Sequence, residues 1–259
     1  MSLRTFYRQR EKGADTLISI VAGVVLWQVV ERLLVRNPLI LVAPTDVWGA
    51  FLGLLGQGEL QRHIWTTFLE FILGYLLAVV VGLGLGVLTG VSRLARDLLN
   101  PWVTIFYNAP VITLAPLFII ALGIGIASKI AIVFIGAVFP ILFNTYVGIV
   151  TVDARLVEAV RAFGGTRVQV FVKVTLPNAL PLTMTGLRLG VGRALVGAIV
   201  SELFGAKAGI GHLIYVSAQE FNTAAAFVGV VLLAIGGYLT FELLKLLERK
   251  VAPWYSARV

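Results

Sequence analysis

The few residues of this chain that could do chemistry are charges set in apolar surroundings. Arg188, Arg193 and Glu202 fall within one apolar segment, where a charged side chain is costly unless it faces protein or water. Around a helix, Arg193 lies about 140° from Arg188 and about 180° from Glu202. No two of them can pair within that helix, so each needs another partner or an aqueous surface. All three are candidates to line a polar pathway, although Arg188 could instead snorkel to the membrane boundary and Glu202 could lie at the opposite interface.

No constellation typical of a catalyst or a metal site is present in the sequence. His63 and His212 are far apart along the chain, and we expect both at the surface. The absence of cysteine excludes disulfides and thiolate metal sites. The chain has no G-x-x-x-x-G-K-[ST] phosphate loop, and the run GLGLG at 82–86 follows no strand. We therefore predict no enzyme activity, metal or cofactor on this chain, and expect any ATP hydrolysis on a separate one.

The composition is that of a membrane protein. Of the 259 residues, 59% are hydrophobic and 13% are charged, with a mean hydropathy of +0.95; soluble domains carry about 25% charged residues. The net charge of +8 could suggest nucleic acid, but the bases are scattered among apolar segments. Membrane topology explains them better, so we expect an all-α polytopic protein in a lipid bilayer, with no nucleic-acid partner.

Six apolar segments are long enough to cross a bilayer, which takes about 20 residues each. The predicted spans lie near 16–35, 67–90, 101–122, 127–150, 181–204 and 226–247. The third contains Pro101, Pro110 and Pro116 and should be kinked or broken, either as the wall of a pathway or as a tilted helix that tolerates prolines. The amphipathic stretch 45–66 is predicted to be a surface helix with a lead-in to the second span. We expect one membrane domain over 1–259.

Two spans carry small residues at every fourth position. The second has Gly74, Ala78, Gly82, Gly86 and Gly90, and the fifth has Gly186, Gly190, Ala194 and Ala198. Small residues at this spacing let helix backbones approach closely in lipid. We expect both spans in the interior, against another helix or another subunit.

Lysine and arginine set the predicted orientation. With the N-terminus inside, the inner segments hold Arg4, Arg8, Arg10, Lys12, Arg93, Arg96, Arg155, Arg161, Arg167, Lys173, Lys245, Arg249, Lys250 and Arg258. The outer segments hold only Arg32, Arg36, Arg62, Lys129 and Lys207. This bias predicts cytoplasmic termini and a cytoplasmic 153–181 segment. Glu70 is expected at the outer interface.

The polar stretch 153–181 is predicted to form two short helices at an elbow. Asp153 suits the N-cap of the first helix, and a Gly-Gly pair would end it. Its apolar contacts would come from Ala154, Val157, Ala162 and Phe163. Pro177 and Pro181 would stop the second helix, about 166–175, before the fifth span. By periodicity alone, a hairpin lying on lipid headgroups fits about as well.

The spacing within this stretch resembles the EAA loop of ABC importer permeases. That pattern is Glu-Ala-Ala, three residues, Gly, nine residues, then Ile-x-Leu-Pro. The chain has this spacing in Glu158-Ala159-Val160, Gly164 and Val174-Thr175-Leu176-Pro177. It departs at Val160 and Val174, which are both small and apolar. The runs APTDVWGAF, VITLAPLFIIALGIGIASKI and VSELFGAKAGIGHLI are similar to the nitrate/sulfonate/taurine branch of these permeases.

This resemblance implies a type I ABC importer permease fold with about six transmembrane helices in the bacterial inner membrane. The implied partners are a second permease subunit, as a homodimer, two ATP-binding subunits that hold ATP and Mg²⁺, and an extracytoplasmic substrate-binding protein. The element that couples to the ATPase would contain Glu158, Ala159, Val160, Gly164, Leu176 and Pro177. The expected cargo is a small organic anion such as a sulfonate, taurine or nitrate, with a pyrimidine vitamin precursor or an aromatic carboxylate as alternatives. The competing classes are a secondary transporter driven by an ion gradient, for which no internal symmetry is evident, and a noncatalytic membrane scaffold.

Overall fold

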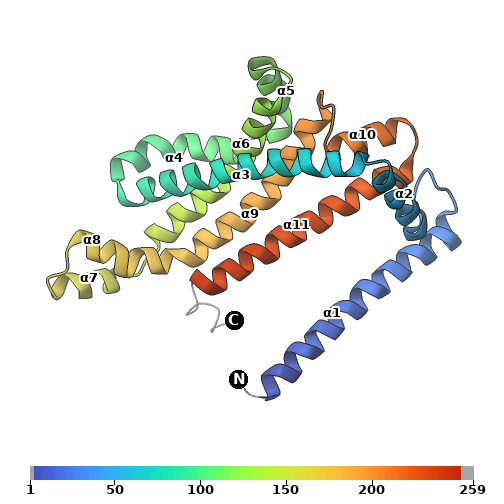
Figure 1. Ribbon diagram of the computed structural model, residues 1–259. Coiled ribbons are helices and arrows are strands. Elements are labelled where there is room, and N and C mark those ends of the chain that lie inside the picture. The colour runs from blue at the N-terminus through green and yellow to red at the C-terminus, as the bar shows by residue number, and fades with distance from the viewer. Residues whose placement is uncertain (1–2, 252–259) are drawn as a thin grey trace. The chain divides into compact units, whose positions relative to one another are not determined.

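The computed structural model describes residues 3–251, and every regular element in that range is a helix (Figure 1). In chain order these are α1 (Leu3–Val30), the π-helical turn η1 (Glu31–Val35), α2 (Pro44–Gly56), α3 (Glu59–Val91), α4 (Arg93–Asn108), α5 (Val111–Leu122), α6 (Ile126–Val150), α7 (Ala154–Ala162), α8 (Arg167–Val170), the π-helical turn η2 (Phe171–Thr175), α9 (Leu176–Leu203), α10 (Ile210–Gln219) and α11 (Thr223–Val251). The two chain ends and Arg258, which the orientation argument uses, lie outside the described residues.

Five described helices are long and apolar enough to cross a membrane. They cover Ile18–Val35, Glu59–Val91, Ile126–Val150, Arg167–Leu203 and Thr223–Lys250. A sixth span results if α4 and α5 count as one bent pair. The all-α fold with about six spans is therefore confirmed, and the lead-in to the second span is part of α3 itself.

The predicted break in the third span is confirmed, and Pro110 marks it. Helices α4 and α5 are bent by more than 40° where they meet. Pro110 is the N-cap residue of α5, whereas Pro101 and Pro116 lie inside α4 and α5. Proline at a helix start costs nothing because its missing N–H would have no intrahelical partner there.

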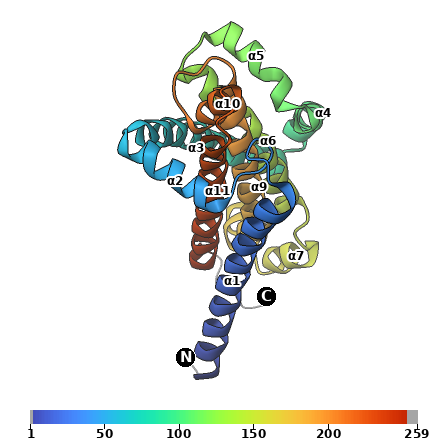
Figure 2. The ribbon, with the colours of Figure 1, turned by 90° about the vertical axis from the view of Figure 1, so that its right-hand side faces the viewer.

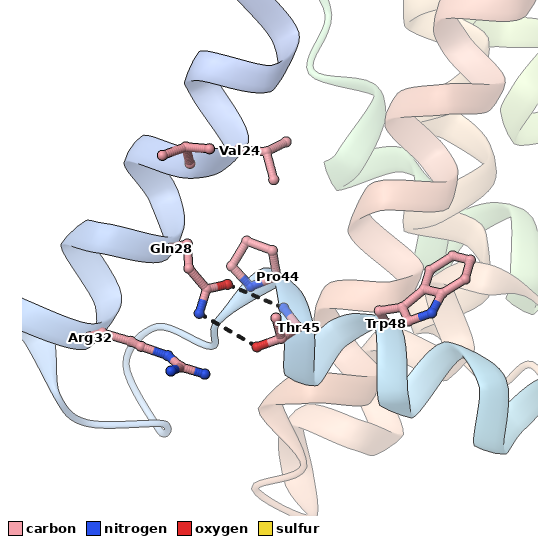
Figure 3. A pocket seen from close by; sticks show the side chains of 7 residues that line it. Val24, Gln28, Arg32, Pro44, Thr45 and Trp48 are labelled. Atoms are coloured by element: carbon pink, nitrogen blue, oxygen red, sulfur yellow. Dashed lines mark hydrogen bonds between the residues drawn. The ribbon is translucent and has the colours of Figure 1, made fainter.

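The chain divides into two compact units, which are described separately. The first comprises the chain up to Arg62 together with Leu213–Val231. In it, Gln28 of α1 hydrogen-bonds the backbone and the hydroxyl of Thr45 at the start of α2, at 3.4 and 3.5 Å (Figure 3). These contacts lie in a cleft of about 600 Å³ between the two helices, which Arg32 and Trp48 also line. The ring of Trp27 packs 5.7 Å from that of Phe227.

The second unit, His63–His212 with the chain from Leu232 onward, has α6 at its centre. Helices α3, α6 and α9 lie side by side in Figures 1 and 2. The core joins Tyr75 and Ala78 of α3 to Ile141 of α6 and to Ala194 and Ala198 of α9. Helix α6 is thus the neighbour that both small-residue spans share.

The glycines of α3 and α9 set how closely these helices approach α6. A Cβ atom at Gly82 or Gly86 of α3 would come within 3.0 Å of Ile141 or Thr145. A Cβ at Gly186 of α9 would come within 2.7 Å of the Asn144 side chain. The prediction that both spans pack against another helix is confirmed, because only a hydrogen fits at these positions.

Candidate coupling elbow and intramembrane charges

The elbow begins with a short helix, α7, that is capped at both ends. The Asp153 side chain accepts a hydrogen bond of 2.9 Å from a backbone N–H of the first turn. At the other end, the N–H groups of Gly164 and Gly165 donate to the carbonyls of Arg161 and Val160, both at 2.9 Å. This pair of bonds is a Schellman motif, and Gly164 supplies the left-handed residue that it needs, with φ of 77°. The Gly-Gly pair therefore ends α7 as predicted.

The second helix of the elbow does not end before the fifth span. It starts at a capping box in which Thr166 and Gln169 exchange side-chain to backbone bonds of 2.8 and 3.3 Å. From there α8, η2 and α9 run on as one helix of 37 residues, Arg167–Leu203. The expected stop at Pro177 and Pro181 is wrong. The π turn η2 ends two residues before Pro177, and its wider backbone accommodates the hydrogen bond that this proline cannot donate. Pro181 lies in the first turns of α9.

The elbow presents apolar side chains to its surroundings. Helix α7 has no buried residue. Phe163, expected to supply a packing contact, is instead 92% exposed at the tip, and Leu156 and Val168 are also exposed. Figure 1 shows α7 and α8 at the end of α6 and α9 that lies away from α5. An apolar surface on a projecting element is typical of a binding site for another protein.

The residues of the motif lie on this elbow with different exposures. Glu158, Ala159 and Gly164 are exposed, Val160 and Pro177 are partly buried, and Leu176 is 39% exposed. Exposed basic side chains flank the apolar surface at Arg155, Arg161 and Arg167. A partner that fits this surface would combine an apolar groove with acidic residues at its rim.

The three charges of the fifth span lie in three separate environments, as their angular spacing indicates. Arg188 binds Glu248 of α11, with its Nη2 2.9 Å from the Oε2 of Glu248, and lies over the ring of Phe241 at 5.9 Å. Its charge is therefore already paired within the chain, so it is not a free site for a substrate anion. Arg193 is exposed, and its side chain makes no ion pair or hydrogen bond within the part of the chain that the structure describes.

Glu202 is fully buried and belongs to a buried polar cluster of Thr67, Glu70, Lys129 and Glu202. The Thr67 hydroxyl donates to Glu202 Oε1 at 2.5 Å, and Lys129 Nζ donates to Glu70 Oε1 at 2.7 Å. All four residues are less than 9% exposed. The cluster joins the C-terminal end of α9 to α3 and α6. The ion pair of Lys129 with Glu70 offsets part of the cost of burying these groups.

The start of α10 is held by this cluster and by His63. Three successive N–H groups, of Gly209, Ile210 and Gly211, donate to His63 Nδ1, Thr67 Oγ1 and Glu202 Oε2 at 3.0, 2.7 and 2.5 Å. The first N–H groups of a helix have no intrahelical acceptor, and a carboxylate there also interacts favourably with the helix dipole. A Cβ atom at Gly209 or Gly211 would collide with the Glu202 carboxylate. The two glycines of the GIG run are therefore required for this contact.

The expected positions of three charged residues are corrected here. Glu70 and Lys129 were expected at the outer surface, but they form a buried ion pair. Glu202 does not lie at an interface, since it is fully buried. The structure also brings together His63 and His212, which are far apart in sequence, with their ring centroids 6.1 Å apart and both side chains partly exposed. The cause is the same in each case: these residues lie on helices that are far apart in the sequence but pack against one another in the fold.

The two pathway candidates of the third span lie apart from these charges. Pro110 and Pro116 are exposed on α5. Their neighbour Ala115 is fully buried against Ile132 of α6 and Val200 of α9. The structure thus sets α5 against the C-terminal half of α9 through Ala115, with both prolines exposed.

Comparison with known proteins gives this architecture a family. Residues 78–253 match the family model described as "Binding-protein-dependent transport system inner membrane component". The chain is 36% identical to the putative aliphatic sulfonates transport permease protein SsuC of Bacillus subtilis, over 96% of this chain and 91% of that protein. It is 29% identical to the taurine transport system permease protein TauC of Escherichia coli, over 89% and 86%. It is 30% identical to the formylaminopyrimidine transport permease protein ThiX of Halalkalibacterium halodurans, over 89% and 91%.

A solved structure shows the same fold. In an inward-facing form of the methionine ABC transporter MetNI, one chain is 27% identical and superposes with a TM-score of 0.64, covering 74% of this chain and 96% of that one. Proteins of this kind are translocation components of a membrane transporter rather than enzymes, and they act with an ATPase and a substrate-binding protein. The chain belongs to the binding-protein-dependent transport system inner membrane components, and it is a multi-pass permease subunit of an ABC importer.

Proposed function

We propose that this permease imports a small organic anion, such as a sulfonate, taurine or nitrate, along a pathway lined in part by α9. The observation that carries the proposal is the unpaired guanidinium of Arg193. Its side chain is exposed within the apolar part of α9 and has no ion pair among the described residues, whereas Arg188 is paired with Glu248. An arginine at that depth needs water or a partner, because exposure to hydrocarbon costs about 2.5–3.5 kcal/mol on insertion scales. A water-filled pathway that carries an anion provides both.

The names of the relatives support an anionic cargo. One relative, from Bacillus subtilis, is named for aliphatic sulfonates, and another, from Escherichia coli, is named for taurine. A sulfonate keeps its negative charge at every physiological pH, so a fixed guanidinium is a suitable counter-ion. The relative named for formylaminopyrimidine favours the alternative cargo, a pyrimidine vitamin precursor.

In the proposed assembly, two copies of the chain, each a single membrane domain, form the permease. Two ATPase subunits dock on the elbows from the cytoplasm, hold ATP and Mg²⁺, and leave this chain without a cofactor. A binding protein delivers the substrate from outside, and both chain termini are cytoplasmic. The burial of Lys129 supports this orientation, because it removes one basic residue from the outer surface.

The elbow is the proposed contact with the ATPase. Its motif residues and the exposed Phe163 share one projecting element, and helix Arg167–Leu203 connects that element directly to the pathway span. Closure of the ATPases on ATP would move the elbow as a rigid body and tilt α9. Gly164 sits at φ of 77°. A bulky residue there would distort the elbow and uncouple ATP hydrolysis from uptake while leaving the spans folded.

Uptake by proteoliposomes tests the proposal. With the chain, its ATPase and its binding protein, we expect taurine or alkanesulfonate uptake that needs ATP and no ion gradient. Arg193→Gln should lower uptake, and Arg193→Lys should retain most of it, because the charge is kept. Equal uptake by the unmodified chain and Arg193→Gln would remove Arg193 from the pathway. Uptake driven by an ion gradient without the ATPase would refute the importer mechanism.

A further inference from the structure

The segment between α9 and α10 is fixed at one end by side chains of another helix. The N–H of Gly209, the last residue of the segment, donates to His63 of α3. The N–H groups of Ile210 and Gly211, which begin α10, donate to Thr67 of α3 and to Glu202 of α9. Thr67 in turn donates to Glu202, so one carboxylate joins α3, α9 and the first turn of α10. The rest of the segment includes the exposed Lys207 and has no comparable set of buried hydrogen bonds to other described residues.

The same helix that ends at this cluster begins at the elbow. Arg167–Leu203 is continuous over 37 residues, which is about 55 Å at 1.5 Å per residue and more than the thickness of a bilayer. Figure 1 shows α8 and the start of α10 near its opposite ends. A displacement of the elbow is therefore carried by one stiff element to Glu202.

We propose that Glu202 is a positioning residue of transport, which fixes segment 204–209 and the first turn of α10 to α9 so that they follow α9 when the elbow moves. This inference rests on the proposed coupling at the elbow. It assigns the contacts of Glu202 with Thr67 and Gly211 to transmission between the two membrane faces and not to contact with substrate. Full burial keeps Glu202 away from any aqueous pathway, which agrees with that role.

The cluster provides a matched pair of substitutions. Glu70→Gln and Glu202→Gln each replace a carboxyl group by an amide with almost no change in volume. The amide oxygen at position 70 can still accept the hydrogen bond from Lys129 Nζ. They differ in their hydrogen bonds. Glu70 Oε2 is buried and has no partner among the described residues, so an NH₂ group there displaces no donor. Both oxygens of Glu202 accept hydrogen bonds, so an amide would point its NH₂ group at the hydroxyl of Thr67 or the N–H of Gly211.

Spin-label distances read the position of the segment directly. The chain has no cysteine, so labels can be placed at Lys207 on the segment and at Leu189, an exposed residue of α9, without background. In the assembled transporter, with labels on only one of the two copies of the chain, the unmodified sequence and Glu70→Gln should give one narrow distance that stays the same with and without trapped nucleotide. Glu202→Gln should give a broad distribution, because a buried N–H or hydroxyl left without its acceptor lowers the population of the held segment by about tenfold. A narrow distance for Glu202→Gln, or equal broadening for Glu70→Gln, would overturn the proposal.

A second measurement separates positioning from folding. Substrate imported per ATP hydrolysed should fall in Glu202→Gln and remain unchanged in Glu70→Gln, whereas poor folding lowers both activities and leaves the ratio constant. If Glu202→Gln does not assemble, Thr67→Val and Thr67→Ser replace it. The serine keeps the hydroxyl and should restore the narrow distance and the ratio that the valine loses. The distances do not depend on the cargo, so failure of the proposed function would appear only as absent ATP-driven uptake.

Discussion

Replacing Gly86 by alanine should push α3 away from α6, and the same change at Gly84 provides the control. A Cβ atom at Gly86 would lie 2.6 Å from Thr145 Cβ and 2.8 Å from the Leu142 carbonyl oxygen, whereas at Gly84 it would meet nothing within 4 Å. The Leu142 oxygen is backbone and cannot rotate away. The clash must therefore move a helix or deform the contact.

The expected energies follow from two opposing effects. In a helix interior, alanine is favoured over glycine by about 0.5–1 kcal/mol, and this applies at both positions. Overpacking costs about 1–3 kcal/mol and applies at Gly86 alone. The two variants should therefore differ by about 1–3 kcal/mol, or a few degrees of Tm at about 2–4 °C per kcal/mol for a chain of this size.

Thermal unfolding of the purified variants in detergent, followed by the loss of the monodisperse peak, measures this difference. We expect Gly84→Ala to unfold at or slightly above the temperature of the unmodified chain, and Gly86→Ala to unfold below it. Identical unfolding temperatures for the two variants would refute the close packing of α3 on α6.

Three further substitutions probe other contacts. Lys129→Met should destabilise the chain by about 3–5 kcal/mol, because it leaves two carboxyl groups buried without a cation. Adding Glu70→Gln should recover part of the loss. Strict additivity in this double-mutant cycle would argue against a direct Glu70–Lys129 contact. Arg188→Met and Glu248→Gln should each lower the unfolding temperature, and the double variant should unfold no lower than either single variant, since both changes break the same ion pair between α9 and α11. Additive losses of unfolding temperature would contradict that ion pair. Arg96→Met should weaken the turn after α3, because the Arg96 guanidinium donates to the carbonyl of Gly90 at 2.9 Å and covers the ring of Tyr146; hydrogen exchange that stays slow at residues 88–92 would exclude this role.

The features that depend on local spacing could be predicted from the sequence. The elbow, its glycine end and the broken third span follow from capping residues and proline, which act over a few positions. The small residues at every fourth position of α3 and α9 predicted close packing. Their common partner α6 could not be identified, because the spacing of residues in one helix does not indicate which other helix packs against it. The expected helix stop at Pro177 failed because a preceding π turn accommodates the proline.

The buried polar cluster could not be predicted, for a physical reason. Thr67 and Glu202 are 135 positions apart, and Glu70 and Lys129 are 59 apart, so only the packed helices bring them together. The sequence does place the opposite charges of Glu70 and Lys129 near the ends of two apolar segments. Charges in such places need partners, so this position could have indicated the ion pair. The sequence alone favours an interfacial position for such residues, because that position is the commoner one. The exposure of Phe163 was missed because an aromatic residue in a short helix suggests packing within the chain.

The central claim is that the elbow couples this permease to an ATPase, and Phe163 tests it most directly. Phe163 is 92% exposed, so Phe163→Ser should leave the unfolding temperature unchanged. If its ring anchors the ATPase, the loss should weaken that association by about tenfold or more. Phe221→Ser, at a 75% exposed phenylalanine in the other compact unit, is the matched control.

The decisive measurement is binding of the ATPase subunit to the purified permease, with ATP-driven uptake followed in parallel. We predict that Phe163→Ser loses both and that Phe221→Ser keeps the binding. Full binding and full uptake by Phe163→Ser would contradict the assignment of the elbow as the coupling surface.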